Sequence, residues 1–132
     1  MSQNLAAELL AMSRFILSPV AEQDILSILA WTHQQFGEQA RVRYEALLVQ
    51  AILDVAGDPG RSGVAQRDEI CEKALTYHLW HSRHNVDKSA GRIRKPRHLL
   101  LFRVAEEGVE IGRVLHDSMD LERHLPSEYL EE

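Results

Sequence analysis

The sequence predicts an α+β domain in which a helical hairpin packs on one face of a mostly antiparallel sheet. Three observations indicate this class. A short run of β-forming residues comes first, two segments with helical spacing follow it, and β-rich segments occupy the C-terminal half. At 132 residues, the chain has the length of one compact domain.

The first strand and the first helix are marked by local residue chemistry. Residues 14–17 are a short run rich in β-forming apolar side chains, which predicts a strand. Ser18 can cap the following helix, and Pro19 suits its first position because no hydrogen bond is lost there. Apolar residues recur at helical spacing as far as Phe36, and Gly37 ends the helix.

The second helix is indicated by an apolar stripe and by a clear ending. The run Gly57-Asp58-Pro59-Gly60 stops it, and the short connection at Gly37 makes the two helices an αα-hairpin. The stripe consists of Ala40, Tyr44, Leu47, Leu48, Ala51, Ile52 and Val55.

The middle of the chain carries weaker signals. Residues 66–74 fit a helical turn, and the alternating, β-rich residues 75–80 predict a strand. Residues 82–96 are polar, basic and contain glycine, so we expect a loop.

The C-terminal part predicts a β-hairpin and a short closure. Residues 98–104 and 109–116 are expected to be strands joined by residues 105–108. Residues 120–125 fit a short helix or turn, and the acidic tail 126–132 is expected to be exposed.

Composition excludes several protein classes. The chain is 45% apolar and 27% charged, as in ordinary globular proteins. It has no run of about 18 apolar residues and no signal-peptide pattern, so we expect no membrane contact. Its single cysteine, Cys71, excludes an internal disulfide and fits a cytoplasmic protein.

The net charge of −5 is unevenly distributed. The window from His78 to His98 contains six Lys and Arg residues and one acidic residue. Its net charge is therefore +5, and the rest of the chain has a net charge of −10. Four of the seven histidines lie in the same window. Such a basic segment fits an acidic partner or phosphates, or else a solvated loop.

Three residues near the C-terminus suggest a metal site, but geometry disfavours it. His116, Asp120 and His124 recur every four residues. On a helix they would span about 12 Å, whereas a zinc ion needs each ligand atom within about 2.2 Å. His116 also ends a predicted strand, so we expect no metal there and no cofactor. We expect Asp120 to cap a turn and His124 to lie near the surface.

The sequence also contains no motif typical of covalent catalysis or of phosphate binding. The chain has no G-x-S-x-G motif and no glycine-rich phosphate loop between a strand and a helix. Arg113 lies between Gly112 and Val114 in a predicted strand, where it needs an acidic partner or else faces a ligand surface. The paired arrangement is favoured.

Several motifs together resemble a known family. They are F-I-L-S-P-V-A-E-Q-D-I (15–25), F-G (36–37), P-G (59–60), P-R-H-L-L-L-F-R (96–103) and I-G-R-V-L-H-D-S-M-D-L-E-R-H-L (111–125). Over residues 14–125, the chain resembles the ParE-type toxins of the RelE/ParE superfamily, which belong to type II toxin–antitoxin, or plasmid stabilisation, modules. The predicted element order agrees with the fold that the resemblance implies.

The resemblance implies a cytoplasmic toxin with one of two activities. ParE-type members poison DNA gyrase, whereas RelE-type members cleave mRNA on the ribosome without a metal. For a nuclease, the candidate residues are Arg97, Arg113 and His116, with His98 in reserve. The last strand lacks a tyrosine, Tyr129 lies in the acidic tail, and the net charge is negative, so we expect the gyrase-binding type. A third reading is an inert interaction module.

The resemblance also implies a cognate, ParD-like antitoxin that wraps over the toxin. We expect a groove between the helical hairpin and the sheet, with Trp31 as an interface residue and Tyr44 as a core residue that could also line the groove. The full set of expected binding residues is Trp31, Arg92, Arg94, Arg97, Arg113 and His116. Two features depart from short family members. One is a weakly helical N-terminal extension, residues 1–13, with Leu5, Leu9 and Met12 on one side. The other is a basic insertion at about residues 61–95.

Overall fold

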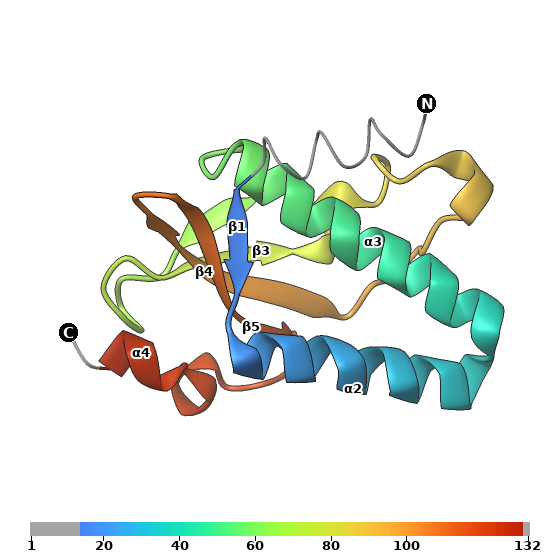
Figure 1. Cartoon of the computed structure of the whole chain (residues 1–132), viewed down its shortest axis with the longest axis horizontal. Coiled ribbons are helices and arrows are strands. Elements are labelled where there is room, and N and C mark those ends of the chain that lie inside the picture. The colour runs from blue at the N-terminus through green and yellow to red at the C-terminus, as the bar shows by residue number, and fades with distance from the viewer. Residues whose placement is uncertain (1–13, 131–132) are drawn as a thin grey trace.

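The computed structural model describes residues 14–130, which form a mixed five-stranded sheet and a helical hairpin (Figure 1). The predicted segments 1–13 and 131–132 lie outside the described residues. The strand order is β1-β5-β4-β3-β2. Only the β1–β5 pair is parallel, so the sheet is mostly antiparallel, as the sequence predicts.

The N-terminal half follows the sequence prediction closely. Strand β1 (Phe15–Leu17) leads into α2 (Pro19–Phe36), where the Ser18 hydroxyl accepts a hydrogen bond from the Ala21 N–H at 3.0 Å. Gly37, with φ of +93°, separates α2 from α3 (Glu38–Gly57). A positive φ costs glycine little, so this residue allows the chain to reverse directly between two long helices.

The middle of the chain differs from the prediction. A short strand, β2 (Val64–Gln66), pairs with β3 (Leu75–His78). The helical turn expected for residues 66–74 is a set of turns that link these two strands. The strand expected to reach Trp80 ends at His78, because residues Leu79–Ser82 form a 3-10 helix, η1. The expected loop also contains a second 3-10 turn, η2 (Lys88–Ala90).

Strands β4 (His98–Ala105) and β5 (Gly108–His116) form the predicted hairpin. Their register shifts between Leu101 and Phe102, where Gly112 is the extra residue of a bulge in β5. The chain then closes with η3 (Leu121–His124) and α4 (Ser127–Leu130).

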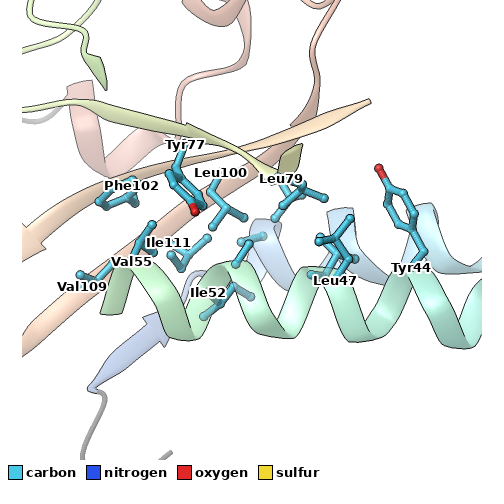
Figure 2. Packing of buried hydrophobic residues seen from close by; sticks show 14 of the residues in the cluster. Tyr44, Leu47, Ile52, Val55, Tyr77, Leu79, Leu100, Phe102, Val109 and Ile111 are labelled. Atoms are coloured by element: carbon cyan, nitrogen blue, oxygen red, sulfur yellow. The ribbon is translucent and has the colours of Figure 1, made fainter. Parts of the chain in front are cut away.

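The main core lies between the helical hairpin of α2 and α3 and one face of the sheet (Figure 2). Leu47, Leu48 and Val55 of α3 pack with Leu100 and Phe102 of β4, and all five are almost fully buried. The prediction of a groove between the helical hairpin and the sheet is therefore wrong, because core side chains fill that space. Tyr44 belongs to this core, as expected.

A second, smaller cluster lies on the opposite face of the sheet. Leu101 points away from the hairpin because side chains alternate along a strand, and it packs with Ala74 and Tyr129. Tyr129 is only 2% exposed, so the prediction of an exposed tail is wrong for this residue. None of the helices within residues 14–130 is long and apolar enough to cross a membrane.

Candidate functional site

Polar side chains gather where β4 begins and β5 ends. His98 and His116 are cross-strand partners, and their ring centroids are 5.4 Å apart. Tyr44 reaches this point from α3, and its hydroxyl oxygen lies 2.6 Å from His98 Nδ1. We call the set Tyr44, His78, Arg97, His98, His116 and Asp117 the histidine cluster.

Burial fixes the protonation of the inner pair of the histidine cluster. Desolvation raises the pKa of Tyr44 to about 12 and lowers the pKa of His98 to about 4. Both groups are therefore uncharged at neutral pH. The Tyr44 hydroxyl oxygen accepts a hydrogen bond from the backbone N–H of Arg97 at 3.2 Å. The Tyr44 hydroxyl can then donate to Nδ1 of His98, which leaves the imidazole proton on Nε2.

Asp117 accepts hydrogen bonds from two other residues of the histidine cluster, Arg97 and His78. The single Nε–H of Arg97 is shared between the two Asp117 carboxylate oxygens, each 3.2 Å from Nε, and Arg97 Nη2 donates to one of them at 3.1 Å. Because His78 Nδ1 accepts from the Trp80 N–H, His78 Nε2 carries the proton that is donated to Asp117 at 3.0 Å. Mainly through the Arg97 hydrogen bonds, the pKa of Asp117 falls to about 2. Asp117 is thus an anion at neutral pH.

His116 is oriented by the turn that follows β5. Its Nδ1 accepts the Ser118 backbone N–H at 3.1 Å and lies 2.7 Å from the Ser118 hydroxyl. Nδ1 is also 3.5 Å from an Asp117 oxygen, but a nitrogen that accepts a backbone N–H carries no proton to share with a carboxylate. Ser118 therefore fixes the orientation of the His116 ring, with Nδ1 as a hydrogen-bond acceptor.

The histidine cluster has acid/base groups but a neutralised cation. Phosphoryl chemistry requires positive charge where negative charge develops in the transition state. Arg97 is 60% exposed on its side chain, but its guanidinium is already bonded to Asp117. A phosphate approaching Arg97 would also meet the Asp117 carboxylate. The arrangement therefore suits a polar contact surface better than phosphodiester cleavage.

Arg113 lies apart from this chemistry because it is committed to a structural pair. Its Nε and Nη2 donate to the two carboxylate oxygens of Asp24 at 2.7 and 2.9 Å. Asp24 also accepts from the Val114 N–H, and Arg113 Nη1 donates to the His124 carbonyl. The acidic partner that the sequence required is thus Asp24, and Arg113 ties α2 to the C-terminal segment.

The other expected binding residues lie on the outside of the molecule. Arg92 and Arg94 are exposed on the segment before β4, close in sequence to Arg97. Trp31 is 55% exposed on α2, and Phe36 at the end of the same helix is 68% exposed. Their rings meet edge to face at 5.7 Å. We call Trp31 and Phe36 the hairpin tip, and Figure 1 shows that the end of α2 that leads into α3 extends past the ends of the strands.

The three residues considered for a metal do not share a helix face. His116 ends β5, Asp120 caps η3 by accepting the Glu122 N–H, and His124 ends η3. Within residues 14–130, no group of three or more His, Cys, Asp or Glu side chains is arranged to hold a metal ion.

Sequence reasoning identified Arg97, His98 and His116, which the structure brings together. It missed Tyr44 as a hydrogen-bond partner of His98, and it missed Asp117 and His78 altogether. The His-Asp pair directly after a predicted strand was an available signal for Asp117. No local pattern could place His78 of β3 beside it, because that contact spans 39 residues.

Comparison with known proteins agrees with this fold and covers most of the chain. Residues 15–121 match the family described as the ParE toxin of the type II toxin–antitoxin system, parDE. Two curated relatives, both named Toxin ParE1, come from the CDC 1551/Oshkosh and ATCC 25618/H37Rv strains of Mycobacterium tuberculosis. Each is 29% identical over 114 residues, which cover 86% of this chain and 98% of the relative. The chain therefore belongs to the ParE toxin family of type II toxin–antitoxin systems.

Proposed function

We propose that this chain is a non-catalytic, cytoplasmic toxin that binds and inhibits DNA gyrase, and that a ParD-like antitoxin neutralises it. Membership of the ParE toxin family implies a cognate antitoxin encoded in the same module. The observation that carries the choice of a binding toxin is the pairing of Arg97 with Asp117. That pair removes the free cation that an mRNA endonuclease would need at the histidine cluster.

The hairpin tip supports a protein target. Trp and other large aromatic side chains dominate the binding energy of protein interfaces when a partner buries them. Trp31 and Phe36 present two such rings in contact with each other on a rigid helical support. We assign the gyrase contact to this tip.

The basic segment supports a separate role in antitoxin binding. Arg92 and Arg94 are exposed and lie within the window that carries a net charge of +5. An acidic partner segment would be attracted there and repelled by the rest of the chain. Reversing Arg92 and Arg94 to Glu should weaken antitoxin binding, whereas Trp31→Ala should weaken toxicity first.

One observation favours a second candidate, a metal-independent mRNA endonuclease. The rings of His98 and His116 are in contact at the rim of the sheet, where two imidazoles could serve as the acid and the base of such an enzyme. Under that reading, His116→Ala would abolish toxicity and Asp117→Asn would raise it by freeing Arg97. Under the gyrase reading, both variants should remain toxic.

The deciding experiment is expression of the chain in bacteria without antitoxin, with plasmid supercoiling and protein synthesis followed in parallel. We expect loss of negative supercoiling before any fall in translation. Translation arrest with supercoiling intact would reject the proposal in favour of the nuclease. Unaffected growth at high expression would reject both and favour an inert interaction module.

A further inference from the structure

The 3-10 helix η1 holds a tryptophan on the outside of the molecule. Leu79 and Ser82 are three residues apart, which places them on the same side of a 3-10 helix, and both are fully buried. Leu79 lies in the main core (Figure 2). Trp80, which follows Leu79 directly, is 45% exposed. One side of η1 is thus fixed in the core, and the other side presents Trp80 to solvent.

The guanidinium of Arg83 lies over this exposed ring. Its carbon atom Cζ is 3.4 Å from the centre of the Trp80 ring, and its Nη1 donates a hydrogen bond to the Trp80 carbonyl at 2.9 Å. Among residues 14–130, no carboxylate pairs with Arg83. A guanidinium has several N–H donors, so Arg83 has donors left for a ligand. We call Trp80 and Arg83 the Trp–Arg stack.

The Trp–Arg stack is held in place before any partner binds. The Trp80 N–H donates to His78 Nδ1 at 3.1 Å, and the His81 ring contacts Trp80 edge to face at 5.3 Å. Gly63 leaves room for the His81 ring, because a Cβ at residue 63 would lie 2.6 Å from it. A side chain that is already fixed loses little conformational freedom when a partner covers it.

A carboxylate of α3 fixes the loop that carries the Trp–Arg stack. Asp54 Oδ2 accepts hydrogen bonds from the Ser82 hydroxyl at 2.5 Å and from the Asn85 side-chain amide at 3.0 Å. The same oxygen lies 3.2 Å from Nη1 of Arg61. Asp54 is committed to these three partners, so it stabilises the loop without neutralising Arg83.

The charge around the Trp–Arg stack favours an anionic partner. The pKa of His81 is lowered first by burial and then by repulsion from His78 and Arg83, so basic groups lie close together here. The stack belongs to the window of net charge +5, whereas the rest of the chain carries −10. A polynucleotide would meet that negative remainder along its length. A short acidic peptide segment needs only the local positive charge.

We propose that the Trp–Arg stack is the docking point for an acidic segment of the cognate antitoxin. A carboxylate of that segment accepts hydrogen bonds from Arg83, and a neighbouring apolar side chain covers Trp80. Trp and Arg are among the residue types that contribute most to the binding energy of protein interfaces. This docking point rests on the antitoxin of the proposed function, and it adds a central contact to the exposed Arg92 and Arg94.

The fluorescence of Trp80 reports this contact. The chain has two tryptophans, so Trp31→Phe leaves Trp80 as the single emitter. The probe is the full-length antitoxin encoded beside the toxin gene, with any tryptophan of its own replaced by phenylalanine. We expect saturating antitoxin to shift the Trp80 emission to shorter wavelength, because the partner excludes water from the indole ring.

The matched control is Trp80→Phe, which leaves Trp31 as the single emitter. Its emission should not shift, because the hairpin tip stays uncovered when the antitoxin is bound. An unchanged Trp80 emission at saturation, or a shift of the Trp31 emission alone, would overturn the proposal.

Titration calorimetry with charge variants tests Arg83 separately. Arg83→Gln removes the cation and should raise the Kd for the antitoxin about tenfold. Arg83→Lys keeps the charge but loses the planar guanidinium, so it should raise the Kd less. The control Arg123→Gln removes the same charge from η3, where the side chain is 83% exposed, and should change the Kd less than about twofold. Equal weakening by Arg83→Gln and Arg123→Gln would show that only net charge matters and would reject the docking point.

The outcomes distinguish this docking point from the proposed function. Circular dichroism checks that each variant is folded. Tight binding of the antitoxin that Arg83→Gln and Trp80→Ala both leave unchanged would overturn the docking point alone. Gyrase inhibition is measured without antitoxin, so its absence would contradict the proposed target and not the docking point. Tighter binding of poly(U) RNA than of the antitoxin at Trp80 would reject the acidic peptide in favour of a nucleic acid.

Discussion

Replacement of Tyr129 by alanine should destabilise the whole domain, although the residue lies only three positions from the C-terminal end of the chain. Tyr129 is 2% exposed, packs with Leu101, and has the guanidinium of Arg103 3.8 Å from the centre of its ring. A buried aromatic side chain removes at least about 150 Å² from water, worth about 4 kcal/mol at about 25 cal/mol per Å². Because the short α4 can relax, we expect a loss of about 3 kcal/mol in the free energy of unfolding.

Urea unfolding followed by circular dichroism measures this loss, and the neighbouring Leu130 offers a matched control. Leu130 is 69% exposed on the same helix, so Leu130→Ala should change the free energy by less than about 0.5 kcal/mol. A Tyr129→Ala variant within about 1 kcal/mol of the wild type would refute the reasoning, because α4 would then contribute no packing to the second cluster.

Three further predictions concern stability. Arg113→Ala leaves the half-buried Asp24 without its guanidinium partner. It should lower the free energy of unfolding in urea by about 2 to 3 kcal/mol. An equal loss in the charge-neutral double variant, Asp24→Asn with Arg113→Gln, would show that packing alone causes the effect. The folded pKa of His98, about 4, lies below its ordinary value of 6.5, so only the unfolded chain binds this proton between those pH values. Stability should therefore rise by about 2 kcal/mol from pH 4 to 6.5, allowing for partial exposure, and His98→Gln should reduce that rise. Gly108 has φ of +138°, and a Cβ there would collide with the Arg14 carbonyl, so Gly108→Ala should lower the melting temperature and speed amide exchange in β1.

Much of the fold could be predicted because the decisive signals are local. The Ser18-Pro19 start, the Gly37 stop and the run from Gly57 to Gly60 each fix a backbone conformation through their own chemistry. The hairpin between β4 and β5 is similarly local, since only Glu106 and Glu107 separate the two strands. These elements agree with the structure to within a few residues.

The errors arose where distant contacts decide the structure. Strand β2 has three residues and exists because β3 pairs with it, so the short run Val64–Gln66 gives little signal of its own. The C-terminal tail is acidic in sequence, but Tyr129 finds an apolar site beside Leu101 on the far face of the sheet. Composition alone could not indicate that site.

The candidate site was predicted in part for the same reason. Arg97, His98 and His116 flank predicted strands, so their grouping follows from antiparallel pairing. The hydroxyl of Tyr44 comes from α3, 54 residues away from His98, and the sequence indicated only that Tyr44 is a core residue. Asp117 changes the chemistry of the histidine cluster most, because its carboxylate neutralises the Arg97 guanidinium. This effect depends on where the fold places both residues.

The most direct test of the proposed function is a supercoiling assay with purified DNA gyrase and the purified toxin. We predict that the toxin blocks supercoiling, and that Trp31→Ala and Phe36→Ala each raise the concentration needed by about tenfold. His98→Ala should leave inhibition unchanged, as should Leu26→Ala, an exposed residue of the same helix. Full gyrase activity at high toxin concentration, together with cleavage of mRNA on ribosomes that His98→Ala abolishes, would contradict the account.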